Sequence, residues 1–180
     1  MGMTISKNTL RNWLTKDKTY LDELVCVLKS IALEKDSIVN CDETWCKVRK
    51  YDHYKKCYIG VLVNKARKTA IFFYENGSCG RDVLTDFLGD AELKSIMSDG
   101  YNAYVFIGNE LKSARFKYGS DAGAGMAATY HSMIGTVKLH GSSVWNFIGT
   151  FFKKIFNGCR DYVNMVPDKI TLRSEERRVG

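Results

Sequence analysis

The sequence predicts an α/β fold in which helices precede and follow a mixed sheet. Three runs typical of strands follow one another with short polar connections, which favours antiparallel hairpins. A helical pattern and a fourth strand pattern come next, and a helical crossover usually returns a strand parallel in the same sheet. We expect the strands at 37–49, 57–63, 69–74 and 93–98 and the crossover helix at 81–88.

The first of these strands carries an acid in its middle. Because side chains alternate along a strand, Asp42 should share a face with Asn40 and Thr44, while Glu43 points the other way. A carboxylate within an apolar strand is costly unless something pairs with it or water reaches it. Two interpretations are open at this stage: an acid on an edge strand that faces water, or a metal-binding catalytic aspartate.

The second strand, 57–63, is apolar on both faces and is expected to be central. Two helices are expected before the sheet, at 4–16 and 18–33, the second with one apolar stripe. The first of them is basic and could touch a DNA backbone, but we favour packing through Trp13.

Two further helices are expected after the sheet. Ser120 or Asp121 can cap a helix that runs to Leu139, and Ser143 can cap the last one. The last helix has a broad apolar face, for which we expect core packing, with a subunit contact as the alternative.

The composition favours an acidic partner such as nucleic acid, since 27 Lys and Arg outnumber 20 Asp and Glu for a net charge of +7. Each basic patch taken alone, at 47–56 and at 65–68, is interpreted as a solvated surface. The six cysteines lack CxxC spacing and are read as reduced thiols, with a zinc site as the weaker alternative. Without an export signal or a long apolar run, we expect a cytoplasmic protein with no membrane partner.

The end of the fourth strand supplies a second acid. If that strand lies beside the first, Asp99 comes near Asp42. Two neighbouring carboxylates cannot comfortably stay ionised without a cation, and Mg²⁺ suits carboxylates, phosphate oxygens and water. Spacing alone leaves this a suggestion, since a chain with 20 acids offers many pairs.

Several motifs resemble one known family. CDETW at 41–45, SDGYNAY at 98–104, GSDAGAGMAATYHSMIGTVKLHG at 119–141 and VWNFIGTFFKKIFNG near the end look like the bacterial insertion-sequence transposase family numbered sixty-six. The likeness extends roughly over 5–170. It implies a ribonuclease-H-like core with an Asp-Asp-Glu triad, in which Asp42 resembles the first metal-binding Asp and Asp99 the second. Such enzymes use Mg²⁺ (or Mn²⁺) to cut transposon ends and join the freed 3′ hydroxyl to target DNA; a homo-oligomer is a further possibility.

The sequence departs from the family pattern where the third acid belongs. Family members carry a long helical segment after DGY and then a Glu shortly before an Arg-Pro pair, but here only 105–118 separates DGYNAY from GSDAGAG, and the sole proline is Pro167. Glu110 is nearest by position, but its surroundings do not match. We therefore expect an internally deleted chain, also truncated before Met1, with impaired cleavage and strand transfer. The alternatives are a non-catalytic DNA-binding or oligomerisation module, and a nuclease with only two essential acids.

The expected organisation has four parts. An N-terminal helical segment spans 1–36, a ribonuclease-H-like core 37–118 and a C-terminal helical segment 119–172. The end, 173–180, resembles a translated sequencing adapter, so we excluded it from the fold prediction.

Overall fold

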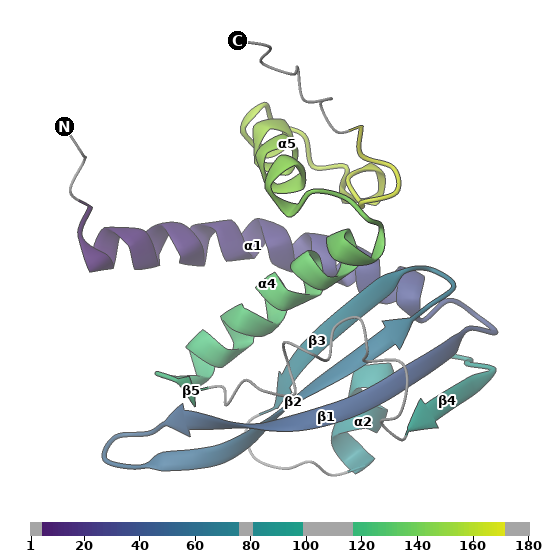
Figure 1. Cartoon of the computed structure of the whole chain (residues 1–180), viewed down its shortest axis with the longest axis horizontal. Coiled ribbons are helices and arrows are strands. Elements are labelled where there is room, and N and C mark those ends of the chain that lie inside the picture. Colours follow the sequence, from purple (N-terminus) through teal and green to yellow (C-terminus); the bar gives the residue numbers. More distant parts are fainter. Residues whose placement is uncertain (1–4, 76–80, 99–116, 172–180) are drawn as a thin grey trace.

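The computed structural model describes residues 5–75, 81–98 and 117–171 (Figure 1). A long helix comes first, three strands and a short helix follow, and two further helices come after the sheet. The elements in chain order are α1 (Lys7–Ala32), β1 (Ile38–Arg49), β2 (Tyr54–Asn64), β3 (Thr69–Glu75), α2 (Arg81–Leu88), β4 (Ser95–Ser98), β5 (Lys117–Tyr118), α4 (Asp121–Leu139), α5 (Val144–Phe156) and a 3-10 turn at Tyr162–Asn164.

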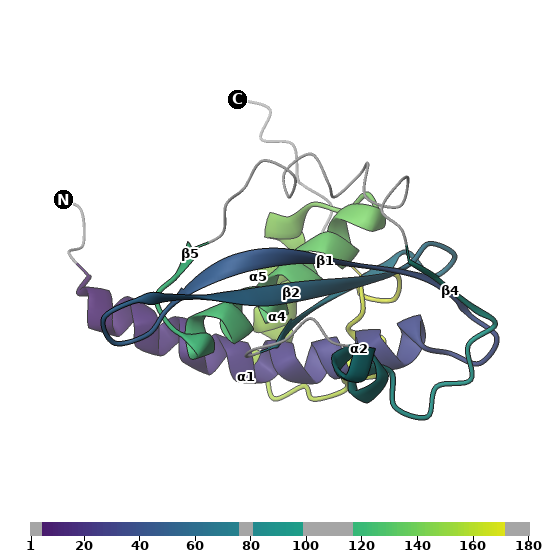
Figure 2. The ribbon, with the colours of Figure 1, turned by 90° about the horizontal axis from the view of Figure 1, so that it is seen from below.

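The sheet has the predicted mixed topology. Its order is β3-β2-β1-β4, with β5 also paired to β1. The β1–β2 and β2–β3 pairs are antiparallel, whereas β4 and β5 run parallel to β1. The helix α2 makes the crossover between β3 and β4, and β2 is central, so these expectations are confirmed. Figure 2 shows the sheet edge-on, with α1 and α2 on one side of it.

The covered face of the sheet changes half-way along β1. Val39 and Cys41 are buried in a cluster with α1, whereas Cys46 and Val48 point to the other face and join a cluster with α4. Between these two pairs, Asp42 and Glu43 are both exposed. The strand is therefore packed on opposite sides at its two ends and open in its middle.

The prediction of two N-terminal helices is wrong, because α1 is one continuous helix through residues 16–18. That polar stretch contains no Gly or Pro, and Lys18 pairs with Asp22 one turn later (2.5 Å). Packing through Trp13 is also wrong, since 47% of its surface is exposed. The buried side chains of α1 run from Leu21 to Ala32, and the helix extends several turns before them toward the N-terminus (Figure 1).

The helix α4 covers the outer edge of β3. The backbone N–H of Phe72 donates to Ser132 Oγ (2.8 Å), and that of Ala70 donates to Thr136 Oγ1 (3.1 Å), which in turn donates to the Ala70 carbonyl (3.1 Å). An edge strand otherwise leaves these groups unpaired. Gly135 lies between Ser132 and Thr136 on α4. A Cβ added there would be 3.4 Å from the Cβ of Ala70, so the helix approaches β3 closely.

The broad apolar face of α5 packs only in part. Phe147, Phe151 and Ile155 are buried, in the same cluster as α1 and α4. Trp145 and Phe156, which we expected in the core, are 82% and 76% exposed. The face is wider than the surface that α1 and α4 offer to it.

The cysteines within the described ranges are all free thiols, as expected. Three of them, Cys41, Cys46 and Cys57, are buried in strands. Across 5–75, 81–98 and 117–171, no helix is both long and apolar enough to span a membrane.

Candidate metal site and its surroundings

The side chain of Asp42 projects from the middle of β1 into solvent. On the β2 side it is level with Val61, which itself is level with Phe72 of β3, so all three lie on one face of the sheet. Its carboxylate Oδ1 accepts a hydrogen bond from the backbone N–H of Glu43 (2.7 Å). The alternation places Glu43 on the opposite face, as predicted.

On its other side, β1 is flanked by β4. The parallel register runs from Ile38 opposite Ser95 to Cys41 opposite Ser98. These last two residues directly precede Asp42 and Asp99 in the sequence. Asp99 itself lies outside the described residues, as does Glu110, so the predicted meeting of two aspartates stays a prediction.

The described groups near Asp42 fit a hard divalent cation in their chemistry. Asn40 and Thr44 share its face of β1, and carboxylate, amide and hydroxyl oxygens are the donors that Mg²⁺ and Mn²⁺ accept. Among the described residues, no cluster of three or more His, Cys, Asp and Glu side chains could hold a metal ion. A cation at Asp42 would therefore need oxygens from outside this set, such as substrate phosphates and water.

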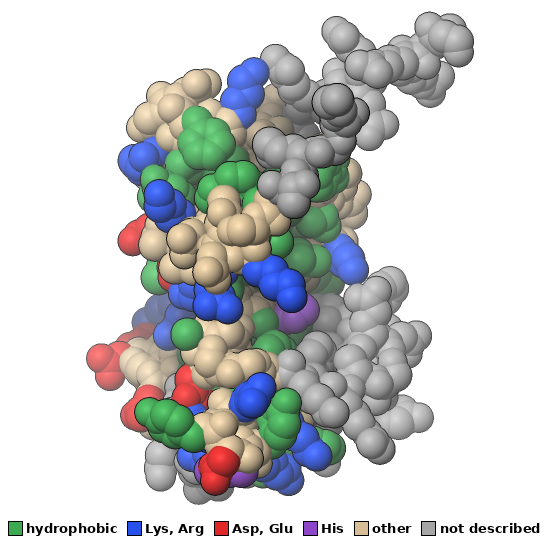
Figure 3. Space-filling view, turned by 90° about the vertical axis from the view of Figure 1, so that its left-hand side faces the viewer, with side chains coloured by type: hydrophobic (Ala, Val, Ile, Leu, Met, Phe, Trp, Pro, Cys, Tyr) green, Lys and Arg blue, Asp and Glu red, His purple; other side chains and the backbone are tan. Residues whose placement is uncertain are grey.

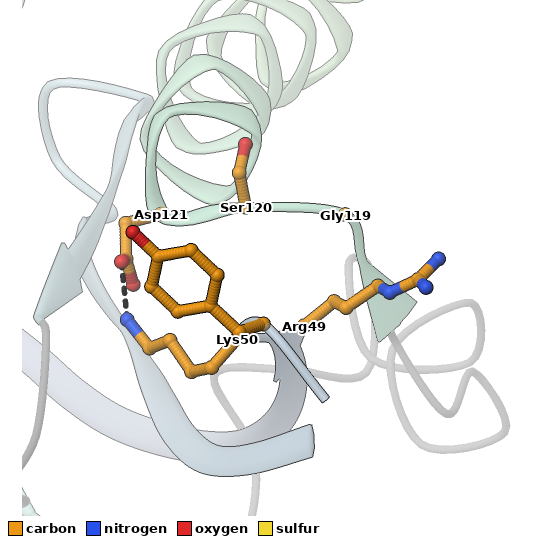
Figure 4. A pocket seen from close by; sticks show the side chains of 6 residues that line it. Arg49, Lys50, Gly119, Ser120 and Asp121 are labelled. Carbon is orange, nitrogen blue, oxygen red and sulfur yellow. Dashed lines mark hydrogen bonds and ion pairs between the residues drawn. The ribbon is translucent and has the colours of Figure 1, made fainter. Parts of the chain in front are cut away.

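A second polar cluster joins the β1–β2 hairpin to the start of α4. Lys50 Nζ forms an ion pair with the Asp121 carboxylate (Figure 4). Tyr74 donates its hydroxyl proton to the same carboxylate. Ser120 caps the helix by accepting a hydrogen bond from the Gly123 N–H (3.1 Å). Sequence reasoning found the cap but missed the ion pair, whose partners are 71 residues apart.

The cluster fixes the charge of its acid. Hydrogen bonds from Lys50 and Tyr74, with a smaller effect of the Lys50 and Lys55 charges, lower the pKa of Asp121 below its ordinary value of 3.8. Burial, and then the bond to Asp121, raises the pKa of Tyr74. The acid thus stays ionised and the phenol neutral at physiological pH, as suits a structural tie.

An open hollow of about 450 Å³ lies beside this tie, lined by 49–51 and 119–121. In Figure 4, Lys50 points toward Asp121, whereas Arg49 projects away from it. Because Lys50 and Asp121 neutralise each other, we assign this cluster to holding the hairpin in place rather than to a reaction.

One comparison with known proteins decides the family. The sequence model described as Transposase IS66 family matches residues 1–115 of the 180. The chain belongs to this family. No curated protein and no solved structure matches it.

The match to the IS66 transposases confirms the resemblance drawn from CDETW and SDGYNAY, which both lie within it. The segment 119–141, which also resembled the family, lies beyond the matched range, so that part of the resemblance stays a prediction. The chain is thus transposase-related, with a mixed α/β sheet and helices at both ends.

Proposed function

We propose that this chain carries the metal-binding half of a ribonuclease-H-like transposase core, with Asp42 and Asp99 as carboxylate ligands for Mg²⁺ or Mn²⁺. The observation that carries the proposal is the register of β4 on β1. Parallel strands keep their register, so extending the pairing by one residue beyond Cys41 and Ser98 would set Asp99 beside Asp42.

The order of the sheet supports the fold assignment. Three antiparallel strands are followed by a helix and a strand that returns parallel to the first. Asp42 lies on β1, the strand that pairs with β2 on one side and with β4 on the other. β1 is packed from opposite sides at its ends, which fixes the backbone that carries Asp42. A fixed ligand on a regular element suits a site that must hold a cation in place.

The chemistry follows from what this chain supplies. The Asp42 carboxylate would hold the cation, and its exposed side chain is accessible to a DNA phosphate. A divalent cation there would activate the attacking water or 3′ hydroxyl and stabilise the leaving oxygen. We propose that catalysis is impaired, because the segment that carries the family's third acid is missing from the sequence.

Mn²⁺ binding by the full chain tests the metal site, because it requires no turnover. Asp42→Asn should weaken Mn²⁺ binding at least tenfold, measured by the loss of the free-ion paramagnetic resonance signal. Glu43→Gln is the matched control, since it removes the neighbouring carboxylate on the opposite face. Equal binding by the two variants would refute the assignment of Asp42.

A second candidate is a non-catalytic module that binds DNA or a complete transposase. The exposed basic hairpin formed by β1 and β2 favours it. A Mg²⁺-dependent cleavage assay on transposon ends separates the two candidates. Cleavage that Asp42→Asn abolishes identifies the enzyme, DNA binding without cleavage identifies the module, and cutting of unrelated DNA or RNA without joining identifies a nuclease.

A further inference from the structure

The far end of the β1–β2 hairpin reaches beyond the other long strands. The pairs from Cys46–Cys57 to Arg49–Tyr54 lie past the last pairing with β3, which is Tyr58 with Glu75. On the other side, the two-residue β5 is the one strand among the described residues that pairs with the hairpin there. Figure 1 shows this two-stranded ribbon extending past the rest of the sheet. The residues of β1 and β2 that alternate with the buried ones here are exposed or half-buried, so one face of the ribbon is open.

The open face carries three cross-strand pairs of basic and aromatic residues, here called the hairpin ladder. Arg49 is opposite Tyr54, Lys47 is opposite Lys56, and Trp45 is opposite Tyr58. Tyr54 is 53% and Trp45 41% exposed, the three basic residues are exposed and Tyr58 is half-buried. Figure 3, which looks at the side where the hairpin tip lies, shows basic, hydrophobic and acidic side chains next to one another at its lower end.

The opposite face of the ribbon is buried, so the ladder has a firm support. Cys46, Val48 and Cys57 are all 0% exposed and pack with Ala124 and Ala128 of α4. The Lys50–Asp121 ion pair ties the tip of the hairpin to the same helix. The ladder is therefore presented in a fixed arrangement, which reduces the entropy lost when a ligand binds.

The ladder has a charge pattern that the folded chain does not balance. Lys47 and Lys56 stand directly opposite each other, and like charges in that position destabilise a sheet. Within the described ranges, no carboxylate forms an ion pair with Lys47, Arg49 or Lys56. Instead, Lys56 Nζ lies over the rings of Trp45 and Tyr58, 5.8 and 5.3 Å from their centroids. An anionic partner would remove the repulsion.

We propose that the hairpin ladder is a docking surface for single-stranded DNA, whose phosphates contact Lys47, Arg49 and Lys56 and whose unpaired bases stack on Tyr54 and Trp45. Basic side chains interleaved with exposed aromatic rings are the combination that binds single strands without reading their sequence. The identity of the nucleic acid as DNA rests on the proposed function. The ladder lies on the face opposite Asp42, so DNA docking and metal binding use different side chains.

Binding of a fluorescein-labelled thymidine oligonucleotide to the full chain in EDTA tests the ladder without the metal site. Lys47→Gln/Lys56→Gln should weaken binding at least tenfold and lower the salt slope of log K by about 1.4, because two phosphate contacts are lost. Tyr54→Ala should weaken binding at least about fivefold through lost stacking. The control Lys153→Gln/Lys169→Gln removes the same charge from exposed positions on α5 and the C-terminal turn and should change binding less than twofold.

Two further measurements separate the ladder from folding defects and from the proposed function. Lys47→Gln should keep or slightly raise the thermal midpoint, since it relieves the repulsion with Lys56, and Asp42→Asn should bind the oligonucleotide as tightly as the wild type. The proposed role of the ladder is refuted if Lys47→Gln/Lys56→Gln binds the oligonucleotide as tightly as Lys153→Gln/Lys169→Gln does. Equal affinity of Tyr54→Ala and wild type, or tighter binding of a duplex by both, would refute the stacking of unpaired bases.

Discussion

Removal of two hydroxyl groups from α4 should strongly destabilise the fold. Ser132 and Thr136 are both 0% exposed, and they accept the N–H groups of Phe72 and Ala70 on the outer edge of β3. Ser132→Ala and Thr136→Val each leave one buried N–H without an acceptor, at a cost of about 1–3 kcal/mol. The double variant should therefore lose about 2–6 kcal/mol of the roughly 5–15 kcal/mol that stabilises a typical domain.

Urea unfolding followed by far-ultraviolet circular dichroism measures this loss. Ser30→Ala is the matched control, since the Ser30 hydroxyl is exposed on α1 and donates to the Cys26 carbonyl of its own helix (3.1 Å). That variant should stay within about 0.5 kcal/mol of the wild type. Thr136→Ser keeps the hydroxyl and should recover most of the stability that Thr136→Val loses. If Ser132→Ala unfolds at the same urea concentration as Ser30→Ala, α4 does not protect the sheet edge as described.

Three other substitutions follow from the same structure. Gly60→Ala should cost about 1–3 kcal/mol, because its Cβ would lie 2.2 Å from Cζ of Phe73 and force that ring to move, whereas Gly125→Ala, in open space on α4, should raise the thermal midpoint. Burial raises the pKa of Cys46 from 9.0 to about 11. The free energy of unfolding should therefore fall by on the order of 2 kcal/mol as pH rises from 9.0 to about 11. The same pH dependence of unfolding in Cys46→Val would contradict this origin. The pKa of Asp121 is lowered, so its contribution is complete above pH 3.8 and lost in stronger acid, and Asp121→Asn should flatten the acid unfolding curve.

The strands could be predicted because their sequence carries the information locally. β-branched residues at alternating positions and short polar connections placed β1, β2 and β3 to within a few residues. The start of β2 was the exception: residues 50–56 were read as a connection, whereas β2 already begins at Tyr54. The basic residues at 47–56 suggested a solvated surface, although the opposite face of the β1–β2 ribbon is buried.

The helices show where local patterns fail. The buried face of α4 includes Met133 and Val137, but most of its other buried residues are Ala, Ser, Gly and Thr, which give little apolar signal. The useful signal was a pair of hydroxyls four residues apart, Ser132 and Thr136, which lie on one side of a helix. Trp13 and Trp145 were expected to pack because each lies among apolar residues at helical spacing, but the described chain offers no surface that covers them.

The candidate site was predicted in part. The face of β1 on which Asp42 lies follows from the alternation of side chains, and the parallel return of β4 follows from the crossover rule. The Lys50–Asp121 tie could not be foreseen, because nothing in either local sequence indicates a partner 71 residues away.

Because the covered face changes along β1, the strand is held by packing on one face near Val39 and Cys41 and on the other face near Cys46 and Val48. Asp42 lies between these two packed regions and its side chain is exposed, so solutes reach it without any opening of the core. Its position nevertheless depends on both supports. Damage to α1, as by Leu28→Ala, or to α4, as by bulk added at Ala124, should therefore tilt the same carboxylate although neither residue lies on its strand.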